Sequence, residues 1–598
     1  VLVMNKLSSH QIRETFLQFF HSKGHKIIPS ASLIPQDPTI LFTIAGMVPF
    51  KPIFLGQVKS QLKRATSSQK CLRTNDIENV GKTARHHTFF EMLGNWSLND
   101  YFKKEAIEMT MEFFIDVLQM DINRIYVSVF KGEDNIPKDT TSIEIWKSVF
   151  SKYGIDASVG NNERIQEFGK KNNWWGLTTG GPCGPDSEIF YDTGKQPCNN
   201  NCNVNCNCGK YIEIGNNVFM EYLFENGEYL PLGRHNVDFG GGLERVTMIS
   251  QNAGSFYETD IYKPVLNKVK ELSKIDNLHS QRIIADHIKA AVIVIMDGIT
   301  PSNTMQGYVL RRLIRRAMRH ARIVGIENGF TSVIGSVCID QFKQIYPQLD
   351  KQRNYILNEL RKEEDRFNKT LDKGLKELDK YISHTNTISG KEIFTLYETY
   401  GLPKEVTEEI LAEKNITVTN PESFEEAKRQ HQEKSRSSSA GIFKGGLADT
   451  SEMSTKYHTT THLLLAALRK VLGDHVYQKG SNITSERLRL DFPNQENLTQ
   501  EQLQKVEDLV NQAIKEKLPV TYEQLPKEEA LKLVPFAAFK EKYGDTVKVY
   551  YIGDKKNPFS IEICNGPHVD NTSVLGTFKI IKQESVGNGI KRIKGVLN

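Results

Sequence analysis

The sequence contains no long uninterrupted hydrophobic run. Nothing in its 598 residues approaches the roughly 20 apolar residues of a membrane-spanning helix. The N-terminal segment, residues 1–20, places Lys6, Arg13 and Glu14 among apolar residues at helical spacing, so it lacks the apolar core of a secretory signal. The composition, with 39% hydrophobic and 25% charged residues, is that of an ordinary soluble protein. These absences argue against a membrane protein and favour the cytoplasm.

A strong imbalance of charge is also missing. The 77 basic and 72 acidic residues leave a formal net charge of only +5. A balance this small neither requires nor excludes a nucleic-acid partner, because binding to phosphates depends on where the positive charge clusters. The position of the arginines therefore matters more than the total charge.

Cysteine is scarce, and half of it lies in one loop. Four of the eight cysteines crowd into residues 198–208, whereas the others are dispersed at Cys71, Cys183, Cys338 and Cys564. Crowded cysteines in a cytosolic chain indicate a metal site more than disulfide bonds.

The length excludes a single hydrophobic core, since domains usually contain about 100–200 residues. The patterns predict a multidomain α+β protein. Residues 1–251 mix β-rich runs with short amphipathic helices, and residues 252–434 show the 3.6-residue periodicity of helices. Residues 435–453 are rich in Ser, Gly and Lys and have the composition of a linker. Residues 454–598 open with a helix and continue with strand-like pieces at 487–492, 547–552 and 574–580.

Several characteristic blocks follow one another along nearly the whole chain. They are PSASL (29–33), FTIAGM (42–47), QKCLRTND (69–76), RHHTFFEMLGN (85–95), GPCGP (181–185), VDFGGGLER (237–245) and RIIADH (282–287). The glycine cluster alone would be weak evidence, because it is equally typical of a tight turn before a helix. Together, however, the blocks resemble the alanyl-tRNA synthetases, which are class II aminoacyl-tRNA synthetases.

This resemblance implies a function for each predicted domain. Residues 1–251 would form the antiparallel-sheet aminoacylation domain of class II synthetases. Residues 252–434 would form a helical domain that recognises the tRNA acceptor stem, and residues 454–598 an α+β, zinc-containing editing domain. The implied substrates are ATP, L-alanine and an alanine tRNA.

Adenylate formation requires fixed cationic groups around the phosphates of ATP, and arginine supplies a permanently charged planar fork. By resemblance, Arg73 holds the α-phosphate, while Arg245 reaches the γ-phosphate and stacks on adenine opposite Phe90. The same resemblance implies that Mg²⁺ bridges the phosphates. It adds ATP contacts from His87, Trp175 and Gly242, although a histidine beside aromatic residues is also commonly a packing residue.

Recognition of alanine needs an anion for its ammonium group and a small pocket. Asp238 matches the family residue that provides the carboxylate, and Arg73, Asp238 and Arg245 are together the expected catalytic residues. Asn216 and Trp175 match the other alanine contacts, but a turn asparagine and a core aromatic are the ordinary alternatives. One methyl or hydroxyl group is worth only about 1–3 kcal/mol of discrimination, so glycine and serine demand a second, editing site.

The C-terminal region carries a metal-ligand pattern. His458 and His462 are four residues apart in a predicted helix, which puts both imidazoles on one face. Cys564 and His568 add a thiol and a third imidazole, completing a tetrahedral set for Zn²⁺. A lone pair of histidines at this spacing is usually a solvated helix face, but the second pair in the same domain favours metal. The residues resemble the editing domain of alanyl- and threonyl-tRNA synthetases, in which Gln478 matches another site residue.

The cysteine-rich loop leaves two alternatives open. Its spacing permits a second zinc site made by Cys198, Cys202, Cys206 and Cys208. The terminal C-x-C is not the usual C-x₂-C, so four reduced thiols in a loop are an equally adequate interpretation.

A cluster of arginines predicts the contact with tRNA. Residues 311–322 (RRLIRRAMRHAR) place arginines at helical spacing opposite apolar residues, which predicts a basic face suited to RNA phosphates. The expected contacts on this helix are Arg311, Arg315, Arg316 and Arg319. The resemblance adds Asn303 and Glu398 as readers of the acceptor-stem base pair, although the family commonly has Asp at the latter position.

The sequence thus predicts an ATP-dependent alanine–tRNA ligase that also hydrolyses seryl- and glycyl-tRNA. The chain ends just after the editing region, where relatives continue into an oligomerisation domain, so we expect a monomer. A deacylase without activation, a non-catalytic tRNA-binding paralogue and a zinc-stabilised structural protein are the alternatives. The presence of Arg73, Asp238 and Arg245 argues against the first.

Overall fold

The computed structural model describes most of the chain. The described residues are 6–37, 39–75, 77–83, 86–176, 180–383, 385–440, 451–534, 546–564, 566–587 and 589–598, with the backbone alone for 432–440 and 586–587. Residues 441–450 of the predicted linker lie outside these ranges, as do Asp76 and Arg85 of the sequence blocks.

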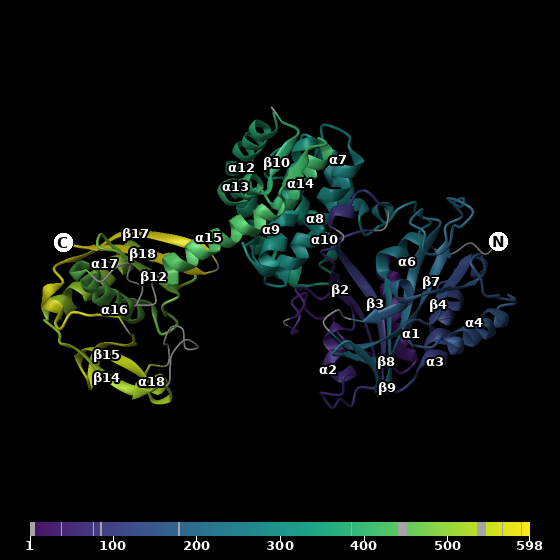
Figure 1. Ribbon diagram of the computed structural model, residues 1–598, viewed down its shortest axis with the longest axis horizontal. Helices are drawn as coiled ribbons and strands as arrows, with labels where there is room; N and C mark the ends of the chain where they lie inside the picture. Colours follow the sequence, from purple (N-terminus) through teal and green to yellow (C-terminus); the bar gives the residue numbers. More distant parts are fainter. Residues whose placement is uncertain are drawn as a thin grey trace. The chain divides into compact units, whose positions relative to one another are not determined.

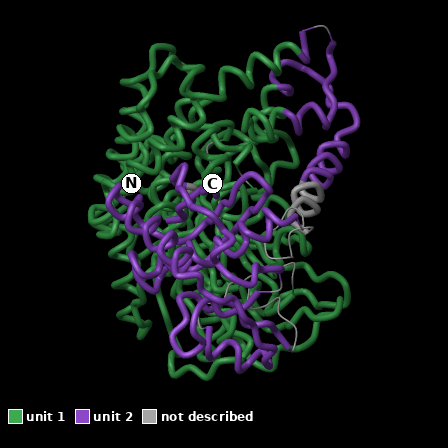
Figure 2. Tube along the Cα trace, turned by 90° about the vertical axis from the view of Figure 1, so that its left-hand side faces the viewer, with its two compact units in different colours: residues 1–380, 396–410 green, residues 381–395, 411–598 purple. Residues whose placement is uncertain are grey.

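The chain divides into two compact units, shown in different colours in Figure 2. The first unit contains Val1–Lys380 and Leu396–Ile410, and the second contains Tyr381–Thr395 and Leu411–Asn598. None of the helices in the described part of the chain is long and apolar enough to cross a membrane. The three domain boundaries expected from the sequence stay predictions.

The first unit is built on a nine-stranded, mainly antiparallel sheet, as expected for a class II catalytic domain (Figure 1). Eight strands follow the order β1-β2-β3-β9-β8-β7-β4-β5, and β6 pairs with β7. Their bounds are β1 Lys26–Ile27, β2 Arg64–Leu72, β3 Phe89–Leu98, β4 Ile125–Phe130, β5 Ile165–Phe168, β6 Trp174–Gly176, β7 Gly181–Asp192, β8 Tyr211–Glu225 and β9 Glu228–Gly242.

Helices pack on this sheet through aromatic side chains. Ser8 and Gln11 form a capping box that starts α1 (Ser9–Ser22). The ring centre of Phe16 in this helix lies 5.1 Å from that of Phe113, and the Phe16 ring stacks on Phe239 of β9. Burial of each such ring stabilises the fold by about 1.5–3 kcal/mol. The other helices of this region are α2 Lys51–Phe54, α3 Lys103–Met111, which continues into a π-helical stretch Glu112–Val117, α4 Thr140–Lys152, α5 Lys170–Asn173 and α6 Leu243–Ser250.

The middle region is helical, which confirms the prediction from periodicity. A short parallel pair of strands, β10 (Thr387–Ser389) and β11 (Thr417–Thr419), is an addition that the sequence did not predict. The helices are α7 Lys263–Leu272, α8 Leu278–Met296, α9 Met305–Ile323, α10 Phe330–Phe342, α11 Gln348–Lys351, α12 Arg353–Ile382, α13 Gly390–Tyr400, α14 Lys404–Glu413 and α15 Glu422–Ala440.

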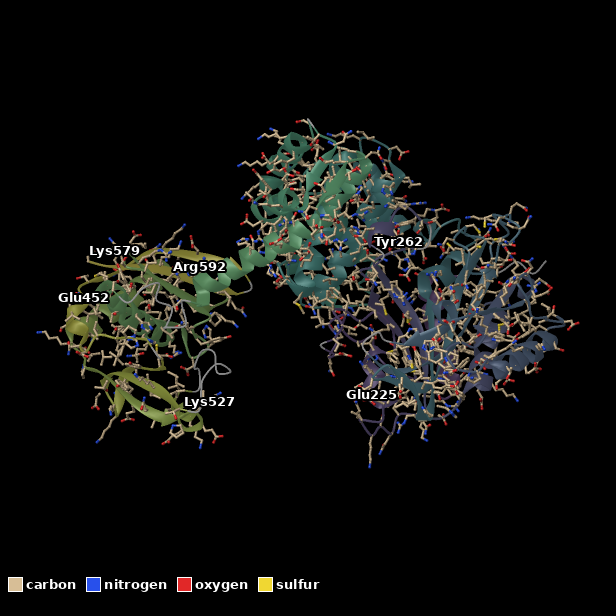
Figure 3. All side chains as sticks on the ribbon, in the orientation of Figure 1. Glu225, Tyr262, Glu452, Lys527, Lys579 and Arg592 are labelled. Atoms are coloured by element: carbon tan, nitrogen blue, oxygen red, sulfur yellow. The ribbon has the colours of Figure 1, made fainter. Side chains whose placement is uncertain are left out.

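The last region combines helices with two antiparallel sheets. The final strand β18 (Ile590–Leu597) is central, because it pairs with both β13 (Leu488–Pro493) and β17 (Phe578–Gly587). Figure 3 labels Arg592 and Lys579, which lie on the neighbouring strands β18 and β17. The remaining elements are α16 Glu452–Leu472, β12 Gly480–Ile483, α17 Gln500–Lys515, β14 Val520–Pro526, α18 Lys527–Leu533, β15 Thr546–Asp554 and β16 Asn557–Ile563.

Two of the three strands predicted here are confirmed, and the third prediction was partly wrong. Residues 487–492 and 547–552 coincide with β13 and β15, whose ends differ from the predicted ends by one or two residues. Residues 574–580 overlap β17 only from Phe578, because Thr572–Val574 forms a 3-10 turn whose start is capped by the Asn571 side chain. A short polar cap therefore delays the strand.

Candidate functional sites

Strand register gathers the predicted alanine contacts on one face of the large sheet. Asp238 of β9 pairs with Val218 of β8 and with Trp96 of β3, and Asn216 of β8 pairs with Gly240. Paired and alternate residues of antiparallel strands share a face, so Asn216, Asp238 and Trp96 point to the same side. Trp175 of β6 packs against the apolar cluster that contains Trp96.

Asp238 is a buried carboxylate with a single described hydrogen bond. It is 5% exposed, and Trp96 Nε1 donates to its Oδ1 at 2.7 Å. Burial raises the pKa of Asp238 to about 7, although the bond from Trp96 opposes this shift. The Oδ1 atom of Asn216, on the same face, is buried and has no hydrogen-bond partner among the described residues. The site thus presents two buried acceptors that fit a cationic ligand.

Two further acids on this face were missed by the sequence analysis. Asp186 and Glu188 of β7 pair with Val218 and Asn216, so they share the face of Asp238. Burial raises the pKa of Asp186 to about 8, against hydrogen bonds from Asn173 and Asn216. Burial and the neighbouring acids Glu213 and Asp186 also raise the pKa of Glu188 well above its usual range. The alternation Asp-Ser-Glu within a predicted strand was a signal that could have identified them.

The expected phosphate-binding arginines lie at the ends of the central strands. Arg73 directly follows β2, its guanidinium lies 5.1 Å from the centre of the Phe90 ring, and its Nε donates to the Ile44 carbonyl at 3.2 Å. Arg245, in the first turn of α6, forms an ion pair of 2.6 Å with Glu213. The Arg73 guanidinium thus lies over the Phe90 ring, and the stacking of Arg245 on adenine opposite Phe90 stays a prediction.

His87 is buried between aromatic rings beside Phe90. Its ring centre lies 5.3 Å from that of Phe90 and 4.8 Å from that of Phe256. Burial lowers its pKa well below the usual value, so the imidazole is neutral. Its Nδ1 atom is buried and has no partner within the described residues, which leaves this nitrogen for a ligand.

The block at 282–287 anchors the strand that carries Phe90. Asp286 of α8 is fully buried and accepts hydrogen bonds from Thr88 N at 2.9 Å and Thr88 Oγ1 at 2.5 Å. Tyr262, labelled in Figure 3, donates to the same carboxylate at 2.9 Å, and so does His287. Helix α8 therefore fixes the backbone next to His87.

The three glycines at the end of β9 differ in what they pack against. A Cβ at Gly240 would lie 2.9 Å from Met92 Sδ, and one at Gly241 would lie 2.9 Å from the Ile214 carbonyl. A Cβ at Gly242 would meet only Arg245, at an ordinary 3.7 Å. Packing within the chain therefore explains the first two glycines but not the third.

We predict that Gly242→Ala weakens ATP binding without unfolding the protein. The added methyl fits the fold, so it can obstruct only a ligand that approaches the β9–α6 junction. We expect the KM for ATP in pyrophosphate exchange to rise about tenfold, which corresponds to about 1.4 kcal/mol. The melting temperature should change little, whereas Gly241→Ala, the matched control, should lower it, because its Cβ would lie 2.9 Å from the backbone carbonyl of Ile214. An unchanged KM would show that ATP does not approach Gly242.

A second site lies in the C-terminal unit, where four predicted ligands come together. His458 and His462 lie on α16, and Cys564 and His568 lie just after β16. One ligand atom from each of the four lies within 4.8 Å of the others. Cys564 Sγ is 3.3 Å from His458 Nε2, and the rings of His458 and His568 stack at 4.2 Å.

Hydrogen bonds around this cluster leave nitrogen lone pairs directed at one another. The Pro567 carbonyl can only accept, so His458 donates to it through Nδ1 at 3.0 Å and its Nε2, which faces Cys564 Sγ, is the unprotonated nitrogen that can bind a metal. His568 Nδ1 contacts Thr459 Oγ1 at 3.3 Å, while its Nε2 and both nitrogens of His462 are buried without a hydrogen-bond partner in the described residues. Burial lowers the pKa of all three histidines, which keeps them neutral. Neutral imidazoles and a thiol fit Zn²⁺.

Gln478 lies just before β12. Its Nε2 donates to Ser481 Oγ at 3.0 Å. A role for this side chain in editing stays a prediction.

The arginines of α9 require a correction to the expected basic face. Arg315, Arg316 and Arg319 are only 6%, 3% and 7% exposed. Arg315 pairs with Glu363 at 2.6 Å, and Arg316 and Arg319 pair with Glu409 at 2.7 and 3.3 Å. Acids from α12 and α14 therefore neutralise this face, and the expectation of an exposed cationic surface at these three positions was wrong. Their participation in tRNA binding stays a prediction.

The other expected tRNA contacts are more accessible. Asn303 is exposed and accepts a hydrogen bond from Arg311, whose guanidinium also pairs with Glu363 at 3.2 Å. Glu398 on α13 is exposed and accepts from Thr399 Oγ1 at 2.8 Å. Both side chains are accessible to a ligand, and the contact of Asn303 and Glu398 with RNA stays a prediction.

Known proteins resemble this chain over nearly its whole length. A family model described as "tRNA synthetases class II (A)" matches residues 11–486, and one described as "Threonyl and Alanyl tRNA synthetase second additional domain" matches residues 547–594. The alanine–tRNA ligase of Treponema denticola is 48% identical over 613 residues, covering 99% of this chain and all of the relative. That of Borreliella afzelii is 45% identical and covers 98% and 99% of the two chains. That of Petrotoga mobilis is 37% identical over 99% of this chain and 80% of its own length.

Proposed function

The chain belongs to the alanyl-tRNA synthetase family of class II ligases, and we propose that it activates L-alanine with ATP, esterifies it to alanine tRNA and hydrolyses mischarged seryl- and glycyl-tRNA. The observation that carries the proposal is the pair of buried acceptors, the Asp238 carboxylate and Asn216 Oδ1, which share one face of the sheet. Arg73 directly follows β2, and Arg245 lies in the first turn of α6, directly after the strand that carries Asp238.

Asp238 binds the ammonium group of alanine. The carboxylate is held by Trp96, and Trp175 packs against the same apolar cluster. A charge-assisted hydrogen bond to a buried carboxylate is stronger than one between neutral groups, so Asp238 fixes the amino end of the substrate. The carboxylate of alanine is then directed toward the α-phosphate of ATP.

Arg73 and Arg245 bind the phosphates of ATP. Attack by the alanine carboxylate places negative charge on the α-phosphate, and the Arg73 guanidinium stabilises it from the end of β2. Arg245 exchanges its contact with Glu213 for the γ-phosphate. The unpartnered Nδ1 of His87 and the backbone at Gly242, where an added Cβ would meet only Arg245, receive the rest of the nucleotide.

The acids Glu188 and Glu213 fit Mg²⁺. The negative charge of Glu213 contributes to the raised pKa of Glu188, so a divalent cation between the two would relieve their repulsion. Carboxylate oxygens are the ligands that Mg²⁺ prefers, with the phosphates supplying the remainder. When bound, Mg²⁺ neutralises phosphate charge and holds the nucleotide in one conformation.

The four-ligand cluster of the C-terminal unit is the editing site. His458, His462, Cys564 and His568 would hold Zn²⁺, which supplies an anchor and a positive charge for the mischarged ester. Thr459 and the Pro567 carbonyl orient the imidazoles by the hydrogen bonds described above. An editing activity is needed because a pocket for alanine rejects serine or glycine by only about 1–3 kcal/mol.

The KM for alanine should depend on pH. The pKa of Asp238 is about 7, so below this pH the carboxyl is protonated and cannot pair with the ammonium group. We expect the KM to rise about tenfold per pH unit below about pH 7 and to level off above it. Asp186, with a pKa of about 8, and Glu188 lie on the same face of the sheet and could also change the KM with pH. Asp186→Asn is therefore the control, and it should leave the midpoint of the pH dependence of the KM near pH 7. A KM that does not change between pH 6 and pH 8 would contradict the role of Asp238.

The overall function is tested by charging an alanine-tRNA transcript with radiolabelled alanine. We expect esterification that depends on ATP, Mg²⁺ and the acceptor-stem base pair that Asn303 and Glu398 are expected to read. Protein that charges no transcript, while deacylating seryl-tRNA, would instead be a deacylase.

A further inference from the structure

The loop that joins β7 to β8, residues 193–210, buries few side chains that could hold it in one conformation. It consists largely of Asn, Cys, Gly and Lys and forms neither helix nor strand. Only two of its side chains, Cys202 and Val204, are buried. Loops with so little buried apolar surface need another source of stability, such as a bound metal.

The cysteines of this loop nevertheless come together. The sulfurs of Cys198, Cys202 and Cys208 all lie within 4.8 Å of one another, and all are free thiols. Cys202 Sγ lies 3.7 Å from Cys208 Sγ. Two sulfurs bound to one tetrahedral zinc at about 2.3 Å would be about 3.8 Å apart, whereas a disulfide requires about 2.05 Å. The observed separation matches one edge of a zinc tetrahedron.

Cys206 lies in the same loop, between Cys202 and Cys208, although its sulfur is not one of the three that all lie within 4.8 Å of one another. The backbone N–H of Asn203 donates to Cys206 Sγ at 3.4 Å, and two consecutive turns present the cysteines: Cys202 N donates to the Asn199 carbonyl and Cys206 N to the Asn203 carbonyl. Backbone N–H groups that donate to sulfur stabilise the thiolate form that zinc requires.

We propose that Cys198, Cys202, Cys206 and Cys208 bind a structural zinc ion, separate from the editing cluster. Four protein ligands close the coordination sphere, so the ion has no open position for substrate. It would fasten the end of the β7–β8 hairpin, next to the pair Asp192 and Tyr211. The same two strands carry Glu188 and Asn216, so this ion stabilises the frame of the alanine pocket.

The test is the zinc content of the full chain, measured by plasma mass spectrometry after purification without added metal. Cys202→Ser and Cys206→Ser should each lower the content by about one equivalent relative to wild type, because each removes one of the four ligands. Cys198→Ser should do the same, and its exposed position keeps the packing intact. Cys338→Ala, in the buried face of α10, is the control and should retain the full content.

This readout is independent of the enzymatic activity and of the editing site. Cys564→Ala should lower the zinc content on its own, and the loss should add to that of Cys202→Ser in the double variant. Unchanged zinc in Cys202→Ser or Cys206→Ser overturns the four-cysteine site. An intact mass about 2 Da below that of the reduced chain, with no zinc to lose, overturns it in favour of a disulfide.

Discussion

Replacing Arg245 with alanine should lower ATP–pyrophosphate exchange with alanine by about 10²–10³-fold, the usual effect of removing one group that stabilises charge in a transition state. The same change should hardly affect folding. Arg245 and Glu213 are 22% and 34% exposed, and a partly exposed ion pair contributes only about 0–1 kcal/mol. A large loss of rate with a small loss of stability separates a phosphate ligand from a structural arginine.

Arg353 provides the matched control for this prediction. It also forms partly exposed ion pairs with carboxylates, those of Asp340 and Asp350, at the start of α12. Arg353→Ala should keep exchange within about twofold of wild type. If Arg245→Ala and Arg353→Ala have the same exchange rate, Arg245 does not bind ATP.

Replacing Cys564 or His462 with alanine should abolish editing and leave activation intact. Mutation of a group that only orients a metal ligand typically lowers metal affinity or activity by about 10–100-fold. Loss of a ligand itself should therefore lower the rate of seryl-tRNA deacylation by at least about 100-fold. Pyrophosphate exchange with alanine should stay within about twofold, because the activation residues lie in the other compact unit. Charging assays with serine should then accumulate seryl-tRNA.

An exposed histidine of the same region controls for the loss of an imidazole. His475 lies on the surface and contacts Asn494, outside the four-ligand cluster. His475→Ala should deacylate seryl-tRNA at the wild-type rate. Deacylation at the wild-type rate by Cys564→Ala would refute a role for the cluster in editing.

Local patterns in the sequence predicted the secondary structure around both sites well. The four-residue spacing of His458 and His462 places both on one face of α16, and the glycine run before Arg245 ends strand β9 directly before helix α6. What the pattern could not provide was the pairing of distant segments. The carbonyl of Pro567, which fixes the tautomer of His458, is more than a hundred residues away in sequence.

The arginine cluster shows the same limitation more clearly. The periodicity of residues 311–322 correctly predicted a helix with one apolar face. It carried no information on Glu363, 48 residues beyond Arg315, or on Glu409, 93 residues beyond Arg316. These acids bury the charges that local sequence assigns to solvent. In contrast, the alternation of Asp186 and Glu188 was visible in the sequence and was overlooked.

The most direct test of the central claim is ATP–pyrophosphate exchange with each amino acid in turn, because it isolates activation from tRNA binding and from editing. The site built around Asp238, Arg73 and Arg245 predicts strong exchange with alanine, weaker exchange with serine and glycine, and none with larger amino acids. Folded, zinc-loaded protein that shows no exchange with alanine would contradict the account and leave deacylation as the function of the chain.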